Sequence, residues 1–167
     1  MTSLLQNSDH PAFDALSASQ AAELIEQARA LMRGAGESCG AGPLQGKHLG
    51  LVCASPDGAD AMFFRRAAAE LGASVAVIRA EAVVSSPLPD MQSTGRVLAR
   101  LYDALECQGM QPALLERLSR AAGVPVYEGL ATPGHPTARL AAMIDGDAAP
   151  DVKRRCVLQA ALLKSLL

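Results

Sequence analysis

Aromatic residues make up only 3% of this sequence, and tryptophan is absent from its 167 residues. The chain therefore lacks the stacking platforms that single-stranded nucleic acids use. Its 15 basic and 17 acidic residues give a net charge of -2, so no positive excess would attract a nucleic acid or an anionic membrane. We expect neither kind of partner, and we expect a single domain with a core of Ala, Leu and Val.

Closely spaced metal ligands are also missing. The four cysteines (Cys39, Cys53, Cys107, Cys156) form no C-x-x-C pair, and the three histidines share no ligand spacing with them. We therefore expect no metal site and no cofactor, and we predict that Cys53 and Cys107 are buried thiols. No signal-peptide pattern and no apolar run of transmembrane length occurs, which favours a soluble, cytoplasmic protein.

Short apolar runs alternate with amphipathic stretches over most of the chain. The runs at 49–54, 75–78, 104–107 and 124–127 have the length of buried strands. Helical apolar faces follow each of them, at 63–71, 97–101, 114–118 and 140–144. Four strand–helix repeats predict an α/β fold, a three-layer domain with a four-stranded parallel sheet flanked by helices. Ligands of such sheets bind at the carboxyl ends of the strands.

One further helix is predicted at each end of the chain, after a loose tail at 1–12. Ser17 and Gln20 form a capping box at the start of the first helix, which should end at Gly34 before a loop at 34–46. The last helix spans 151–167. Its predicted apolar stripe consists of Val152, Cys156, Leu163 and Leu167.

Several stretches keep a common order and spacing over about a hundred residues: 44–52, 64–73, 94–100, 124–130 and His135-Pro136-Thr137. Together they resemble the carbamoyl-phosphate domain of the aspartate/ornithine carbamoyltransferases. The helix at 150–167 resembles the one that returns, in that family, from the amino-acid-binding domain. The resemblance implies one carbamoyl-phosphate-type domain over residues 1–167, no amino-acid-binding domain, and a homotrimer with the loop at 83–90 near the subunit boundary.

The family's phosphate loop reads Ser-Thr-Arg-Thr-Arg, and this sequence carries Asp57, Gly58, Ala59, Asp60 and Ala61 at those positions. In the family, helix N-terminal N–H groups and arginine forks hold the phosphate. A carboxylate about 4 Å from a phosphate oxygen instead costs roughly 1 to 4 kcal/mol, depending on screening. The resemblance thus implies that most of the affinity for carbamoyl phosphate is lost, unless Arg65 reaches back from the next helical turn.

Other family positions differ as well. The family's arginine after the third strand is Gln108, its asparagine after the fourth strand is Glu128, and the glutamine partner of its histidine is Ala138. His135 is retained where the family's histidine polarises the carbamoyl oxygen. Two interpretations of His135 stay open, a residue that begins a helix and a catalytic electrophile, and a lone electrophile without substrate clamps gains little.

Three interpretations of the acidic loop are open. In the first, Pro56, Asp57 and Gly58 form a solvated turn and Asp60 caps the next helix. In the second, the carboxylates form ion pairs, within the chain or with a neighbour. The arginines considered for these pairs are Arg65, Arg96 and Arg100. In the third, Asp57, Asp60 and Glu128 hold a cation or an amine.

These features support three hypotheses about function. The first is a carbamoyltransferase-like module that lacks the parent reaction and binds a small ligand or assembles with other copies. The second is an enzyme of amino-acid metabolism with a changed substrate, bound at the strand ends through His135, Gln108 and the carboxylates. The third is an active carbamoyltransferase whose amino-acid domain comes from another chain.

Overall fold

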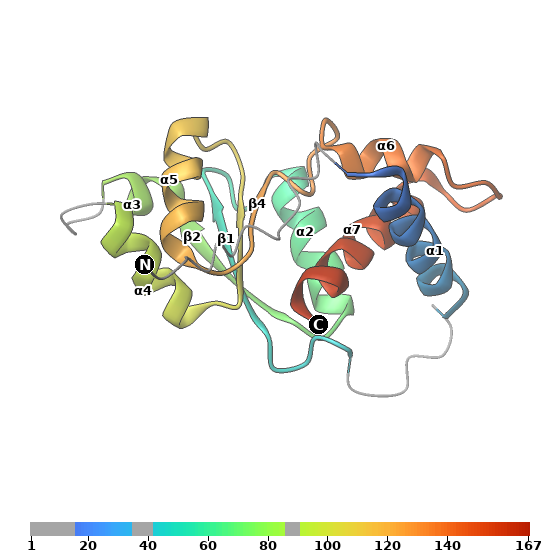
Figure 1. The fold of residues 1–167 in the computed structure, drawn as a ribbon, viewed down its shortest axis with the longest axis horizontal. Coiled ribbons are helices and arrows are strands. Elements are labelled where there is room, and N and C mark those ends of the chain that lie inside the picture. The colour runs from blue at the N-terminus through green and yellow to red at the C-terminus, as the bar shows by residue number, and fades with distance from the viewer. Residues whose placement is uncertain (1–15, 35–41, 86–90) are drawn as a thin grey trace, which may run out of the picture.

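The computed structural model describes residues 16–34, 42–85 and 91–167. Strands and helices alternate along these residues (Figure 1). In chain order the elements are α1 (Ala18–Gly34), β1 (His48–Cys53), α2 (Ala59–Glu70), β2 (Ser74–Arg79), α3 (Ala80–Val84), α4 (Met91–Leu101), β3 (Ala104–Cys107), α5 (Pro112–Ala122), β4 (Val126–Glu128), α6 (Pro136–Ala142) and α7 (Pro150–Leu166).

The four strands form one parallel sheet in the order β2-β1-β3-β4, which confirms the predicted fold class. β1 and β3 are the central strands and β2 and β4 are the edges. Because all strands are parallel, their carboxyl ends meet at one edge of the sheet. The turns that follow β1, β3 and β4 therefore start side by side.

Helices cover the sheet on both faces (Figure 1). On one face, α3, α4 and α5 pack over a core that includes Val52, Leu105 and Leu118. On the other face, α2 and α7 lie nearest the sheet, and α1 and α6 pack against α7. The larger core on this side includes Phe64 and Leu162.

The last helix, α7, is buried on all sides rather than along one stripe. Every residue from Cys156 to Leu163 is buried, because α1, α2 and α6 all pack against α7. The predicted stripe was wrong at its end, since Leu167 is 78% exposed. No helix of the described residues is long and apolar enough to cross a membrane.

Local sequence signals predicted most element ends. The capping box is present, with Ser17 N–H donating to Gln20 Oε1 at 2.9 Å and Gln20 N–H donating to Ser17 Oγ at 3.2 Å. α5 begins at Pro112 and ends at Gly123, whose φ of 67° is left-handed. The short helix α3 was not predicted. Residues 1–15, which contain the predicted loose tail, lie outside the described residues.

Candidate functional site at the carboxyl edge of the sheet

The acidic loop, Asp57 to Ala61, begins in the β1–α2 turn, residues 54–58, and continues into the first turn of α2. Gly58 N–H donates to Ser55 O at 3.0 Å, which closes the turn, and Gly58 is the N-cap of α2 with no side-chain cap. Asp57 is exposed, and among the described residues neither Asp57 nor Asp60 forms an ion pair. The predicted solvated turn is confirmed, but the predicted cap was wrong. Asp60 lies inside the first turn of α2, where the helix dipole favours its charge.

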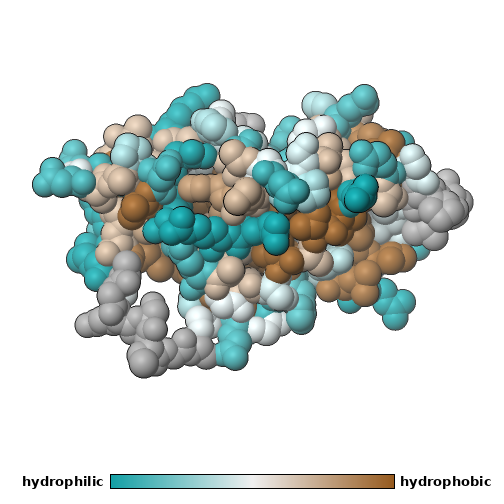
Figure 2. Space-filling model, turned by 180° about the vertical axis from the view of Figure 1, so that it is seen from behind, coloured by the Kyte–Doolittle hydropathy of each residue, from teal (hydrophilic) through white to brown (hydrophobic). Residues whose placement is uncertain are grey.

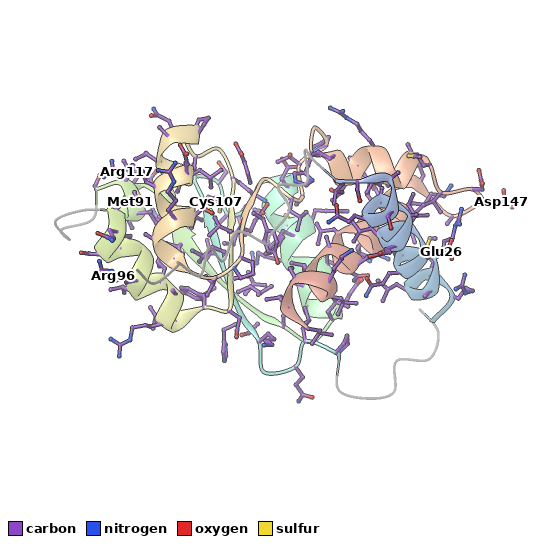
Figure 3. All side chains as sticks on the ribbon, viewed as in Figure 1. Glu26, Met91, Arg96, Cys107, Arg117 and Asp147 are labelled. Carbon is purple, nitrogen blue, oxygen red and sulfur yellow. The ribbon has the colours of Figure 1, made fainter. Side chains whose placement is uncertain are left out.

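Of the arginines considered as partners for this loop, Arg65 is on α2 itself, whereas Arg96 and Arg100 are on α4. Arg96 is on α4, on the opposite side of the sheet from α2 (Figure 3). Burial raises the pKa of the Cys53 thiol in β1, and the charge of Arg65, which is exposed on α2, partly opposes this rise. Ala59 is exposed, whereas Ala61 is 1% exposed in the core. A long cationic side chain therefore fits at position 59 and not at position 61.

Glu106, in the central strand β3, is fully buried beneath this edge. Its Oε2 accepts the N–H of Leu130 at 3.1 Å, and its Oε1 accepts the N–H of Ala131 at 3.4 Å. The side-chain amide of Gln108 donates to the same Oε1 at 3.3 Å. One carboxyl group thus binds the β4–α6 turn, residues 129–135, to β3.

The pKa of Glu106 is raised to about 8, mainly by burial; the hydrogen bonds from Leu130, Gln108 and Ala131 oppose this shift, and the carboxylate of Asp60 contributes to it. Glu106 is therefore mainly protonated at neutral pH. Sequence reasoning did not select this residue. The available signal was a single charged side chain inside the apolar run Ala104–Cys107.

The β4–α6 turn is also held from α6 and α7. Thr137 Oγ1 donates to Leu130 O at 3.2 Å, and Arg154 Nη2 donates to Ala131 O at 2.9 Å. The Arg154 guanidinium also lies 4.7 Å from the centroid of the Phe63 ring of α2. Three elements of the fold therefore fix the carbonyl and N–H groups of this turn.

His135 is the N-cap of α6, and its Nδ1 accepts the N–H of Thr137 at 3.2 Å. The interpretation of His135 as a residue that begins a helix is therefore confirmed, while a catalytic role stays a prediction. Ala138, half-buried in α6, donates its N–H to His135 O at 2.9 Å. His135 and Ala138 therefore both lie in the first turn of α6.

Gln108 follows the end of β3, and Glu128 is the last residue of the neighbouring strand β4. Gln108 N–H donates to Val52 O at 2.8 Å, which extends the pairing of β3 with β1. Glu128 ends β4 opposite Cys107 and is exposed. Burial, together with the carboxylates of Glu106 and Glu128, raises the pKa of the Cys107 thiol to about 12, so this thiol is unreactive. Cys107 is visible at the end of β3 in Figure 3.

The third interpretation of the acidic loop required Asp57, Asp60 and Glu128 to converge. Within residues 16–34, 42–85 and 91–167, no three His, Cys, Asp or Glu side chains are placed to hold a metal ion together. This arrangement was therefore wrong for a metal ion. The edge instead presents the Gln108 amide, the N-terminus of α2 and three acidic residues, Asp57, Asp60 and Glu128, that do not converge on a metal site.

Residues 10–145 match the carbamoyl-phosphate-binding domain of the aspartate/ornithine carbamoyltransferases. The chain belongs to this family. The catabolic ornithine carbamoyltransferase of Pseudomonas putida is 35% identical over 98 residues, and an ornithine carbamoyltransferase of Actinobacillus pleuropneumoniae is 36% identical over the same length. Each alignment covers 59% of this chain and 29% of the relative, so the chain matches only part of these proteins.

Solved carbamoyltransferases share the fold of this family member. The ornithine carbamoyltransferase of Pyrococcus furiosus superposes with a TM-score of 0.66 and 26% identity, over 78% of this chain and 42% of that protein. The corresponding enzyme of Gloeobacter violaceus gives 0.59 and 27%, over 78% and 41%. The carbamoyltransferase-type sheet and its carboxyl edge are thus common to all three.

Proposed function

We propose that this carbamoyltransferase-family protein does not catalyse carbamoyl transfer and acts as a ligand-binding or assembly module. The observation that carries the proposal is the start of α2. Ala59 and Ala61 stand where the family resemblance implies arginines, and Asp60 adds a carboxylate to the first helical turn. The N-terminus of α2 could bind an anion through its backbone N–H groups, but the charge of Asp57 and Asp60 disfavours a phosphate ester there.

The surrounding residues support the same proposal. Gln108 is engaged by Glu106 and carries no charge for a leaving phosphate. The exposed Asp57 and the half-buried Asp60 make no ion pair with a described residue that would neutralise them. Two carboxylates and no arginine clamp favour a neutral or cationic ligand over an anionic one.

Calorimetric titration with carbamoyl phosphate tests the proposal. We expect no measurable binding by the natural protein. The double variant Ala59→Arg, Asp60→Thr returns one cation and one hydroxyl at an exposed helix start, so we expect it to gain binding. Ala113→Arg is the control for the added arginine, because it places the same side chain in the exposed first turn of another helix, α5.

The outcomes separate the three hypotheses. Micromolar binding by the natural protein would contradict the proposal and support an active transferase. Thermal stabilisation by an amine or a divalent cation, without carbamoyl-phosphate binding, would support an enzyme with a changed substrate. The assembly role, with the homotrimer that the family resemblance implies, is tested by the mass in solution, and a monomer would contradict it.

A further inference from the structure

The sequence contains two Asp–Gly pairs, Asp57–Gly58 before α2 and Asp145–Gly146 after α6. Both aspartates are exposed, and neither forms an ion pair with a described residue. Because glycine has no side chain to shield its backbone nitrogen, that nitrogen can attack the carboxyl carbon of the preceding aspartate. The same reactive pair is therefore present in two different turns.

The backbone of Gly58 is held on both sides. Its N–H donates to Ser55 O at 3.0 Å, and its carbonyl accepts the N–H of Met62 at 3.0 Å as the N-cap of α2. A Cβ atom built on Gly58 would lie 3.1 Å from Ser55 O, so the turn is closed around this glycine. Attack by the Gly58 nitrogen on Asp57 must therefore break a hydrogen bond and disturb the start of α2.

Gly146 lies in the α6–α7 loop, residues 143–149, where the backbone is open. No backbone–backbone hydrogen bond joins residues 145–148 to any other described residue, and the Gly146 carbonyl accepts only the Lys153 ammonium, at 2.8 Å, within that part of the chain. Gly146 has a left-handed φ of 103°, and no atom lies within 4 Å of a Cβ built on it.

The α6–α7 loop projects from one end of the molecule, where it forms a hydrophilic tip at the left of Figure 2. Asp147 of the same loop is labelled at this end in Figure 3. Water and solutes therefore have free access to the loop. Rotation that brings the Gly146 nitrogen to the Asp145 carboxyl group breaks no backbone hydrogen bond of the described residues.

We propose that Asp145 is a site of spontaneous isomerisation to isoaspartate, and that the fold protects Asp57 from the same reaction. The Gly146 nitrogen forms a bond to the side-chain carboxyl carbon of Asp145, and its hydrogen leaves with the carboxyl hydroxyl group as water. Water then opens the five-membered imide. Opening at the side-chain carbonyl restores aspartate. Opening at the main-chain carbonyl leaves the chain linked through the side chain, with a free α-carboxylate.

The product would be a substrate for a particular class of enzyme, the methyltransferases that esterify the free carboxylate of isoaspartate with a sulfonium methyl donor. The change adds one methylene group to the main chain of an exposed loop. Since α7 is buried against α1, α2 and α6, we expect the modified protein to stay folded. The inference does not depend on the proposed function, which concerns the start of α2.

Ageing of the folded protein in warm, mildly acidic buffer tests the proposal. After digestion, an isoaspartyl peptide has the mass of the aspartyl peptide but separates from it on chromatography. We expect isoaspartate to form at least about fivefold faster at position 145 than at 57, the factor that corresponds to about 1 kcal/mol, the usual net contribution of one hydrogen bond. Equal rates, or no isoaspartate at position 145, would overturn the proposal.

Synthetic peptides of residues 52–63 and 140–151 show whether the fold causes the difference. In both peptides the glycine N–H is free, so we expect similar rates of isomerisation. If the peptides differ as much as the two turns of the folded protein, the local sequence causes the difference and the protective role of the fold is refuted.

Two variants locate the reaction within the α6–α7 loop. Asp145→Glu keeps the charge, but the next nitrogen would have to close a six-membered ring, which is much slower. Asp147→Glu is the matched control, because Asp147 is exposed in the same loop but precedes Ala148, whose side chain hinders attack. With an isoaspartyl methyltransferase and a labelled methyl donor, the peptide that contains position 145 should be labelled in the aged natural protein and in Asp147→Glu, and should lose its label in Asp145→Glu. Equal labelling in all three would contradict the assignment to Asp145.

Discussion

The two turns that leave β1 and β4 start at the same edge of the sheet but are held very differently. In the β4–α6 turn, the N–H groups of Leu130 and Ala131 bind Glu106, and their carbonyl groups bind Thr137 and Arg154. The β1–α2 turn is closed by one hydrogen bond, from Gly58 to Ser55, and its Asp57 side chain is exposed.

The two turns therefore differ in how much a substitution should destabilise the fold. The β4–α6 turn joins β3, α6 and α7, so a substitution there leaves buried polar groups without partners. The β1–α2 turn can exchange its side chains at little cost in stability, because solvent satisfies them. The side chains of this turn can therefore change while the sheet and its helices stay intact.

The largest expected effect is the pH dependence of the free energy of unfolding that Glu106 causes, because Glu106 binds the β4–α6 turn and not the β1–α2 turn. Its pKa is about 8 in the folded protein, against an ordinary value of 4.5, so between these values the folded state holds a proton that the unfolded state has lost. The free energy of unfolding should therefore fall as pH rises, by up to about 1.4 kcal/mol per pH unit from this group, and level off above the folded pKa. Urea denaturation across this range measures it.

Glu106→Gln is the control for this pH dependence, because glutamine has a similar shape and does not titrate. We expect its unfolding free energy to lack the Glu106 slope and to exceed that of the natural protein at alkaline pH. Parallel pH profiles for the two proteins would show that Glu106 ionises normally, or that another group causes the slope.

The next largest effect is expected when the Glu106 carboxyl group is removed. Glu106→Leu leaves the buried N–H groups of Leu130 and Ala131 without their acceptor, at a cost of about 2 to 4 kcal/mol. Denaturation is best measured below the ordinary pKa of glutamate, where both states of the natural protein are protonated. Asp57→Ala changes the open turn and should shift stability by less than about 0.5 kcal/mol. A Glu106→Leu protein as stable as Asp57→Ala would refute the contrast.

The sequence predicted those features of the molecule that depend on nearby residues. The capping box at Ser17 and the proline start of α5 are local, and the four apolar runs indicated the parallel sheet. The parallel sheet also indicated that Asp57, Gln108 and Glu128 lie at or just after the carboxyl ends of their strands, β1, β3 and β4. By contrast, the all-round burial of α7 depends on α1, α2 and α6, which contact it from distant parts of the chain.

Glu106 shows why the candidate site was only partly predictable. A single glutamate in an apolar strand is visible in the sequence, but its partners are not. They come from the turn 24 and 25 residues later, which reaches Glu106 only because β4 pairs with β3. The shifted pKa follows from the same tertiary burial. The pairing of β3 with β4, which the residue types alone do not reveal, therefore determines that Glu106 binds the β4–α6 turn.

The smallest effect is expected from Asp60, in the first turn of α2, whose charge acts on Glu106. Its carboxylate raises the pKa of Glu106, so Asp60→Asn should lower that pKa and move the end of the stability slope to lower pH. The same variant removes a favourable charge from the first turn of α2, which costs about 0.3 to 1 kcal/mol. Asp57→Asn is the control, because Asp57 is exposed and is not among the groups that shift Glu106. If both variants leave the pH profile unchanged, the charge of the acidic loop does not influence Glu106. If only Asp60→Asn shifts it, the charge of the altered loop reaches the buried carboxyl group beneath the site.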